Sequence, residues 1–392
     1  MMPAARVQAA IELLDAILTA TREAGPAADT IIQRWFKQRR YAGSKDRRAI
    51  RELVYRAIRR FGDPPESGRA AMLGIAADCP ELTELFDGSG YGPSPLVAGE
   101  AVAAGSLLPA WIGAHLDPLA GPAESLLERA PLDLRVNRLK ASREAILERF
   151  PEAMPAPHAG LGLRLPEGFP IEQHVAWQSG QVEVQDEGSQ LVALACEARP
   201  GSFVVDLCAG AGGKTLALAA DMENSGRILA CDVSRDRLSR LPPRLERAGV
   251  SIVEAKLLDA GKEREALASL AGTADTVLVD APCSGSGTWR RNPETRWRLT
   301  PKRLKQLVKT QAYLLDIAAG LLRPSGKLVY AVCSLLTDEG RAQAQSFAAR
   351  HPSLVQAEPG IAAGAPCGSG RMLVPARDGT DGFFVACWRA PC

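Results

Sequence analysis

Residues 203–215, FVVDLCAGAGGKT, decide the fold of this chain. The segment begins as a short apolar run, passes through a loop with three glycines, and continues into an apolar helical pattern. Glycines at such a point permit a tight turn and let the backbone approach a ligand at the N-terminus of a helix. A strand, a glycine loop and a helix in this order predict an α/β domain with a ligand site at the loop.

The sequence after this segment continues to alternate between strand and helix patterns. Apolar strand candidates separated by helical segments recur at 228–232, 252–256, 276–280 and 327–332. This alternation predicts a doubly wound, largely parallel sheet of the Rossmann-like type. A final pair of candidate strands, 371–374 and 383–388, is expected to form an antiparallel hairpin.

The sequence before residue 203 does not show this alternation of strand and helix patterns. Helical periodicity predicts helices at 5–24 and 27–40 and a third that starts at Ser44 as N-cap, with short helices to about 120. From 131 to about 185 a few short strands and a helix at 141–150 suggest a small α+β module. We therefore expect three domains, which are an all-α domain at 1–125, an α+β module at 126–185 and an α/β core at 186–392.

The composition excludes several classes of protein. Hydrophobic residues make up 46% and charged residues 23%, so the chain is too apolar to be disordered. No run of about 18 apolar residues is present, which argues against a membrane-spanning helix. Nine scattered cysteines and four histidines, without a Cys-x-x-Cys pair, predict neither a disulfide framework nor a metal site. We expect a cytoplasmic protein.

The glycine loop does not fit a phosphate-binding motif. A P-loop needs glycine where this chain has Cys208, and the three-glycine dinucleotide pattern also fits poorly. Asp232 ends the next strand, 22 residues after Gly210, where an acid can accept ribose hydroxyls. A ribose acid without a phosphate loop favours S-adenosylmethionine, an adenosine cofactor that lacks phosphate. The alternative is that Asp232 only caps the following helix. Asp259, after the third strand, sits where an acid can meet the adenine amino group, but acids in such loops are also commonly solvated or capping.

Two later strands end in loops that contain cysteine. Cys283 follows the strand that ends at Asp280, and Cys333 follows the strand at 327–332. Because catalytic groups gather at the carboxyl ends of parallel strands, both thiols are expected near the cofactor crevice. Methylation of a pyrimidine at C5 needs such groups, since a thiolate that adds at C6 makes C5 nucleophilic. One cysteine would attack and the other would assist release, but these residues alone do not say which.

Several motifs resemble the Sun/Nop family of RNA (cytosine-5) methyltransferases, in particular its bacterial ribosomal-RNA branch called Fmu or Sun. The core motifs are DLCAGAGGKT (206–215), DAPCSGSGTWRRNPETRW (280–297), LVYAVCSLL (328–336) and TDGFFVACWR (380–389). LRVNRLK (134–140) and VQDEGSQLVA (184–193) match the segments that precede that core. Residues 5–62 are similar to the NusB-like helical RNA-binding domain fused to this branch. The resemblance covers nearly the whole chain.

The resemblance also implies roles for individual residues. Cys333 would be the nucleophile, Cys283 would assist product release, and Asp280 and Lys214 would hold the target base. The cofactor pocket would comprise Cys208, Ala209, Gly210, Ala211, Gly212, Gly213, Lys214, Asp232, Arg237, Asp259 and Asp280. The family usually has Ala-Pro-Gly-Gly-Lys-Thr in the loop, and we expect Ala211-Gly212 to replace its Ala-Pro. The usual Glu-Asn-Glu run after the second cysteine is Asp338-Glu339-Gly340, a departure expected to leave the cysteines untouched.

The net charge of +2 hides two basic segments that could contact RNA. Residues 34–60 hold eleven Lys and Arg against Asp46 and Glu52, a local charge of +9 that includes Arg47, Arg48 and Arg51. Residues 289–309 hold a local charge of +7 that includes Arg290, Arg291 and Arg296, with two tryptophans among them. Arginines beside aromatics favour phosphate and base contacts. The alternative to RNA binding for residues 34–60 is a helix face that is only solvated. For Trp297 the alternative is packing in the core, and we favour core packing for this residue.

Three other functions remain open at this point. Transfer RNA is the second substrate candidate after small-subunit ribosomal RNA. A non-catalytic RNA-binding assembly or antitermination factor would not need the paired cysteines, Asp280 and Lys214. An oxidoreductase that uses a nicotinamide cofactor is disfavoured by the glycine pattern. We expect a monomer.

Overall fold

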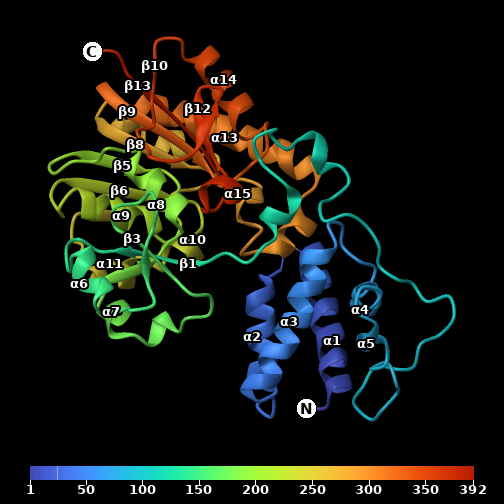
Figure 1. Ribbon diagram of the computed structural model, residues 1–392. Coiled ribbons are helices and arrows are strands. Elements are labelled where there is room, and N and C mark those ends of the chain that lie inside the picture. Colours follow the sequence, from blue (N-terminus) through green and yellow to red (C-terminus); the bar gives the residue numbers. More distant parts are fainter. Residues whose placement is uncertain (24) are drawn as a thin grey trace. The chain divides into compact units, whose positions relative to one another are not determined.

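The computed structural model describes residues 1–23 and 25–392, which form two compact units. The first unit comprises Met1–His115, Ala123–Glu128 and Thr288–Pro301. The second comprises Leu116–Pro122, Arg129–Gly287 and Lys302–Cys392. The helices and strands of both are labelled in Figure 1. The three-domain division with boundaries at 125 and 185 stays a prediction.

The first unit is helical, as the sequence predicted. Its helices are α1 (Pro3–Arg22), α2 (Ala28–Gln38), α3 (Ser44–Arg60), α4 (Gly68–Ala76) and α5 (Pro80–Thr83). Short 3-10 turns follow at η1 (Ile112–Ala114), η2 (Ala123–Leu126) and η6 (Pro293–Arg298). The prediction of Ser44 as N-cap was wrong by one residue, since Gly43 occupies the cap position and Ser44 is the first helical residue.

A single apolar core joins these helices. Val7, Leu14 and Ile17 of α1 pack with Ile32 of α2 and with the apolar stripe of α3, all fully buried. Trp297 belongs to the same core, 7% exposed, and its indole donates to the Phe61 carbonyl at 2.9 Å. The expectation of core packing for Trp297 is therefore confirmed. The sequence did not predict that the segment Thr288–Pro301 belongs to the helical unit.

The second unit contains a small antiparallel sheet in the order β2-β3-β1-β4. Its strands are β1 (Leu132–Val136), β2 (Met154–Pro155), β3 (Gly162–Leu165) and β4 (Val182–Val184). Helices α6 (Arg143–Leu147) and α7 (Val175–Gln178) and the turn η3 (Ile171–Gln173) belong to the same region. Leu134, Phe150 and Leu163 are among the buried residues of its core.

The large sheet has nine strands in the order β11-β12-β13-β9-β8-β5-β6-β7, with β10 paired to β13. The parallel strands are β5 (Phe203–Asp206), β6 (Arg227–Asp232), β7 (Val253–Leu257), β8 (Ala274–Asp280) and β9 (Leu322–Val332). The antiparallel part comprises β10 (Val355–Ala357), β11 (Ala365–Cys367), β12 (Gly370–Leu373) and β13 (Phe383–Arg389). The predicted Rossmann-like sheet and its terminal hairpin are both confirmed.

Helices cover this sheet (Figure 1). They are α8 (Glu187–Leu194), α9 (Gly213–Asp221), α10 (Arg235–Leu238), α11 (Leu241–Ala248), α12 (Glu263–Ala266), α13 (Pro301–Leu321), α14 (Arg341–Arg350) and α15 (Pro375–Asp378), with short turns at η4 (Ala268–Leu270) and η5 (Ser286–Thr288). The chain builds outward from β5 on one side through β6 and β7 and on the other through β8 and β9. Ligands bind at such a reversal of strand order, beyond the carboxyl ends of the strands.

Candidate active site

The two cysteine loops meet at the carboxyl ends of β8 and β9. These strands pair in parallel with Asp280 opposite Ala331, so the residues that follow them emerge at the same edge of the sheet. The Cys283 and Cys333 Sγ atoms lie 3.3 Å apart, and both residues are partly exposed. The predicted convergence of the two thiols is thus present in the structure.

The environment distinguishes the Cys283 thiol from its neighbour. The hydrogen bond with Cys333, together with burial, raises the pKa of Cys283 well above its ordinary value. Cys283 therefore stays protonated at neutral pH and can donate its proton toward the Cys333 sulfur. Either sulfur can donate in this contact, so which thiol attacks stays a prediction.

Lys214 and Asp280 form an ion pair beside the thiols. Lys214 is the second residue of α9, and its Nζ lies 2.7 Å from Asp280 Oδ2 and 5.3 Å from the centre of the Phe383 ring. Burial acts to lower the pKa of Lys214, but the charges of Asp280 and Cys333 outweigh it and the pKa lies above its ordinary value. Lys214 is therefore a fixed cation whose field reaches the Cys333 sulfur.

The glycine loop lies between β5 and α9 and has the predicted tight turn. Gly210 and Gly212 have φ values of +56° and +85°, in the left-handed region that glycine tolerates. The space around the Cα of Gly213 is open, so a ligand can reach the backbone there. The alignment of Gly212 with the family's proline was wrong, because proline is locked near φ −65°. Counting back from Thr215 puts Gly210-Ala211 opposite Ala-Pro instead.

Asp232 holds the loop and also caps the chain beyond β6. Its Oδ2 accepts from the Gly210 N–H at 2.8 Å, and its Oδ1 accepts from the Ser234 N–H at 2.7 Å. Arg237 adds an ion pair to Oδ1 at 3.0 Å. A carboxylate has about four acceptor sites, so Asp232 can still accept one more hydrogen bond, at Oδ2. Both interpretations of Asp232 therefore remain compatible with the geometry.

The remaining loop residues are where the sequence placed them. Asp259 is exposed and lies two residues beyond the end of β7. Cys208 and Ala209 follow β5, and burial raises the pKa of the Cys208 thiol well above its ordinary value, so it stays neutral. The cofactor role of these residues stays a prediction.

Glu339 is a site residue that the sequence interpretation missed. It is fully buried, and its carboxylate accepts from the Ser284 N–H at 2.9 Å, from Gln311 Nε2 at 2.9 Å, and from the hydroxyls of Ser284 and Ser334. Ser284 follows Cys283 and Ser334 follows Cys333, so one carboxylate ties both cysteine loops together. The acidic run thus supplies a carboxylate that joins the two cysteine loops, and the expectation that its departure from the usual run leaves the cysteines untouched stays a prediction.

The six arginines expected to bind RNA differ in their exposure to solvent. Arg296 is 1% exposed and donates to the backbone carbonyls of Pro293, Leu107 and Ile58 within the helical unit. Its donors are used and no phosphate can reach them, so its prediction as an RNA-binding residue was wrong. Arg290 is only 6% exposed, while Arg291 is partly exposed.

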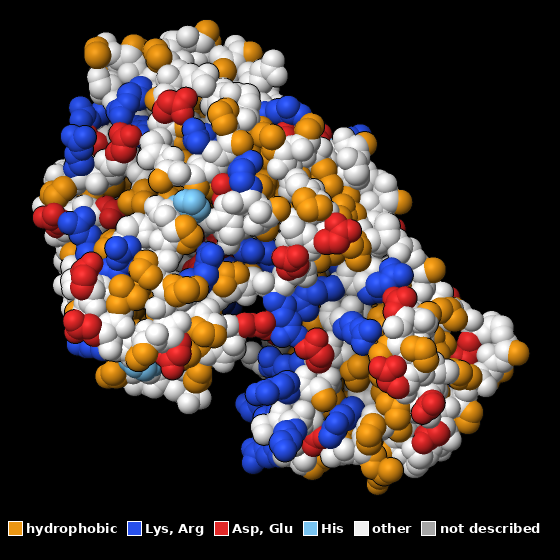
Figure 2. Space-filling view, viewed as in Figure 1, with side chains coloured by type: hydrophobic (Ala, Val, Ile, Leu, Met, Phe, Trp, Pro, Cys, Tyr) orange, Lys and Arg blue, Asp and Glu red, His pale blue; other side chains and the backbone are white. Residues whose placement is uncertain are grey.

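The basic segment of α2 and α3 has a different character. Arg47 and Arg48 are exposed and Arg51 is partly exposed. A shallow hollow of about 730 Å³, which we call the basic hollow, is lined by Gln33, Phe36, Lys37, Arg40, Ser44, Arg47 and Arg51. Figure 2 shows Lys and Arg side chains gathered over this part of the helical unit. This surface can offer several cations to one polyanion.

Membrane-spanning helices and metal clusters are both absent from the described part of the chain. Within residues 1–23 and 25–392, no helix is both long enough and apolar enough to cross a membrane. Over the same residues, no group of three or more His, Cys, Asp and Glu side chains could hold a metal ion.

Comparisons with known proteins agree on one family. The profile described as 16S rRNA methyltransferase RsmB/F matches residues 193–389. A ribosomal RNA small subunit methyltransferase B of Xylella fastidiosa strain 9a5c is 35% identical over 67% of this chain and 62% of its own length. The protein of the same name from strain Temecula1 is 29% identical over 95% of this chain and 88% of its own length. The match to the first thus spans less than two thirds of that relative.

Solved structures share this fold. The crystal structure of PH0851 superposes with a TM-score of 0.77 and 25% identity, covering 99% of both chains. A methyltransferase homolog protein from Pyrococcus horikoshii gives a TM-score of 0.60 and 30% identity over 68% of this chain and 89% of its own.

Proposed function

Because the chain belongs to the 16S rRNA methyltransferase RsmB/F family, we propose that it transfers a methyl group from S-adenosylmethionine to C5 of a cytosine in RNA. The substrate that we propose is small-subunit ribosomal RNA, on which the relatives act according to their names. The observation that carries the proposal is the contact between Cys283 and Cys333, 3.3 Å apart, beside the ion pair of Lys214 and Asp280.

The chemistry of the thiol pair supports this reaction. The sulfur of Cys333 adds to C6 of the cytosine, which forms an S–C6 bond and makes C5 nucleophilic. After C5 has taken the methyl group, a base removes the C5 proton, the S–C6 bond breaks and the thiolate leaves. Cys283 suits this last step, because its thiol lies 3.3 Å from Cys333 and can give its proton to the leaving sulfur, after which the Cys283 thiolate takes the C5 proton.

Lys214 and Asp280 suit the binding of the base. Lys214 stays a cation beside the thiol pair, where its charge can orient the target base. Lys214 takes Oδ2 of Asp280, so Oδ1 can accept a hydrogen bond from the cytosine amino group. The target base must be unpaired or flipped out for a thiol to reach C6.

The residues at the glycine loop fit S-adenosylmethionine, which supplies an electrophilic methyl group when bound. Asp232 has acceptor capacity left for a ribose hydroxyl, and the open space at Gly213 lets a ligand approach the backbone at the N-terminus of α9. Cys208 stands where a P-loop needs glycine, which fits a cofactor without phosphate. Arg237, paired with Asp232, would fix the carboxylate in its orientation.

The Arg47, Arg48 and Arg51 surface suits sequence-independent contacts with the RNA backbone. Such contacts release counterions, so they make binding depend on salt concentration. Charge reversal at these three positions is expected to flatten the dependence of RNA affinity on salt. An unchanged slope would exclude this surface as the RNA-binding face.

Two cysteine variants test the reaction. Cys333→Ala should abolish methyl transfer, whereas Cys283→Ala should still form the S–C6 bond and then accumulate a covalent protein–RNA adduct that denaturing gels detect. An adduct in the Cys333 variant instead would reverse the two roles. Methylation in both variants would refute the thiol mechanism.

The substrate is tested by bisulfite mapping of RNA from cells that lack the gene. We expect one small-subunit rRNA position to lose its 5-methylcytosine and to regain it when the purified chain and S-adenosylmethionine are added. Loss of a transfer-RNA position instead would correct the substrate but leave the reaction in place.

A further inference from the structure

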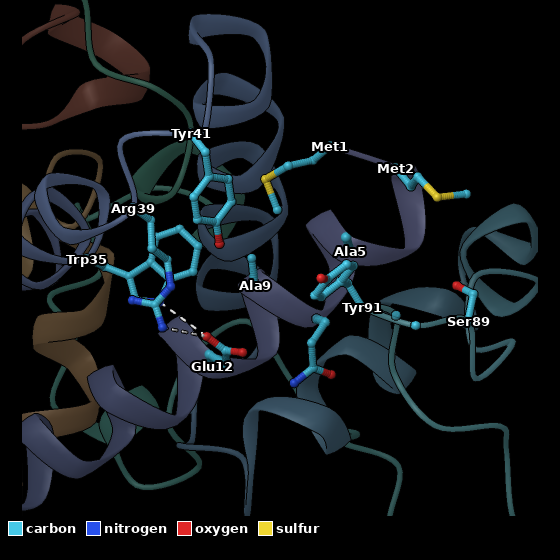
Figure 3. Close-up of a pocket in the computed structure, with 13 residues that line it drawn as sticks. Met1, Met2, Ala5, Ala9, Glu12, Trp35, Arg39, Tyr41, Ser89 and Tyr91 are labelled. Atoms are coloured by element: carbon cyan, nitrogen blue, oxygen red, sulfur yellow. Dashed lines mark hydrogen bonds and ion pairs between the residues drawn. The ribbon is translucent and has the colours of Figure 1, made fainter.

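A second hollow, of about 700 Å³, lies within the helical unit among residues of α1, the end of α2 and the loop around Tyr91. We call it the aromatic hollow, because Trp35, Tyr41 and Tyr91 line it (Figure 3). The side chains of Tyr41 and Tyr91 are 71% and 86% exposed. Exposed aromatics around one concavity of this volume mark a binding site rather than ordinary surface.

One wall of the aromatic hollow is a fixed pair of planar groups. The Arg39 guanidinium carbon lies 4.1 Å from the centre of the Trp35 ring. Glu12 Oε2 accepts from Trp35 Nε1 at 3.4 Å and from Arg39 at 3.3 Å, as the dashed lines in Figure 3 show. Since both contacts use Oε2, Glu12 Oε1 can accept a hydrogen bond from a ligand.

The surroundings of this hollow favour an anionic partner. Trp35 lies in the last turn of α2 and Arg39 directly follows this helix, while Phe36, Lys37 and Arg40 of the same stretch line the basic hollow. Residues that line the two hollows are thus interleaved along positions 35–40 of the chain. A nucleic-acid strand whose phosphates lie on the basic hollow can therefore place a planar base in the aromatic hollow.

We propose that the aromatic hollow binds one unpaired nucleobase of the RNA substrate, stacked on the tyrosine rings and donating its amino group to Glu12 Oε1. The inference rests on the proposed RNA substrate and adds a binding site outside the catalytic unit. Every nucleobase has a face that can stack on an aromatic ring. Only adenine, guanine and cytosine have an exocyclic amino group, so uracil is the base that Glu12 should disfavour.

Binding of a fluorescently labelled single-stranded RNA of about 12 nucleotides tests the stacking. The double variant Tyr41→Ala/Tyr91→Ala should bind about 5- to 150-fold more weakly than the unchanged chain, and Tyr41→Phe/Tyr91→Phe should bind normally. Val97→Ala/Val102→Ala is the matched control, since these exposed apolar residues of the same unit lie outside the hollow. The control should keep full affinity.

Salt dependence separates stacking from phosphate contacts. The tyrosine double variant should reduce affinity by the same factor at every salt concentration. Arg47→Ala/Arg51→Ala should instead lower the slope of log affinity against log salt by roughly 0.7 for each phosphate of a single strand that is no longer neutralised. A changed slope in the tyrosine variant would refute stacking.

Base replacement tests Glu12. An oligonucleotide of uracil alone should bind less tightly than one that contains amino-bearing bases, and the ratio of the two affinities should fall to about one in Glu12→Ala. Because removal of the Glu12 charge strengthens binding of both RNAs alike, this ratio is free of that effect. If the ratio of the two affinities were the same in Glu12→Ala as in the unchanged chain, Glu12 would not contact the base.

Methyl transfer measured on the same preparations keeps this inference separate from the proposed function. If the unchanged chain methylates RNA but the tyrosine variant binds RNA equally well, the aromatic hollow takes no base and the proposed function stands. If binding depends on the tyrosines but no methyl group reaches RNA, the hollow is assigned correctly and the proposed reaction is wrong.

Discussion

Removal of the Glu339 carboxylate is the most informative single change in the catalytic unit. Glu339→Ala deletes the acceptor shared by the Ser284 N–H, two serine hydroxyls and Gln311. The hydroxyls can turn toward each other, since the Ser284 and Ser334 Oγ atoms lie 3.1 Å apart. The Ser284 N–H and the Gln311 amide remain buried without this acceptor. Both cysteine loops are then deprived of the group that joins them.

The magnitude follows from these contacts. Each buried donor left without a partner costs about 1–3 kcal/mol, and the deleted side chain also leaves a cavity. The free energy of unfolding should therefore fall by about 3–5 kcal/mol, a total below the plain sum because the groups share one network. Glu339→Gln keeps Oε1 as an acceptor for Ser284 N and Gln311, and its amide can donate to the two hydroxyls. Its cost should stay near 1–2 kcal/mol.

The assay combines urea unfolding with single-turnover methyl transfer to RNA. A displacement of a reacting group by about 1 Å can cost on the order of 100-fold in rate, so Glu339→Ala should slow the transfer by this order, at RNA concentrations that saturate binding. Glu339→Gln should stay within about tenfold of the unchanged chain. Glu265→Ala, an exposed carboxylate on α12 of the same unit, is the matched control.

Two results would refute this role of Glu339. If Glu339→Ala were as stable as the control and transferred methyl groups at the unchanged rate, the carboxylate would not position the thiols. If the alanine and glutamine variants were equally impaired, the negative charge rather than the hydrogen-bond geometry would be the essential property.

Three other variants test the local physics. Burial raises the pKa of Asp206 to about 7. The folded chain therefore keeps a proton on this carboxyl that the unfolded chain loses near pH 4. The contribution of Asp206 to the free energy of unfolding is lost as the pH rises through about 7. Asp206→Asn should thus gain stability over the unchanged chain between about pH 4 and 7, by up to about 4 kcal/mol in urea titrations, and parallel pH curves would contradict this. Gly212→Ala should lower the free energy of unfolding by more than about 1 kcal/mol in thermal unfolding and weaken cofactor binding in calorimetry. The reasons are that φ at this position is +85° and that an added Cβ would meet Leu241. Unchanged stability and binding would show that Gly212 is not a strained position. Arg296→Met should lower the free energy of unfolding by about 1–3 kcal/mol and leave the salt slope of RNA binding unchanged; a reduced slope would restore its predicted RNA contact.

The sequence alone determined the α/β core and the position of the thiols. Strand and helix patterns are local, since each depends on the spacing of apolar residues along a few turns. The edge at which Cys283 and Cys333 meet follows from parallel pairing, which places all carboxyl ends on one side. The glycine loop and Asp232 were found for the same reason.

Only the tertiary structure decided which charged groups are available to a ligand. Arg296 and Arg47 look alike in sequence, yet the first donates to carbonyls more than 180 positions away and the second lies on the surface. Glu339 reaches Ser284 across 55 positions, and Tyr91 joins Trp35 in one hollow. A residue's charge is fixed by its type, but its burial and partners depend on packing between distant segments, which no local pattern specifies.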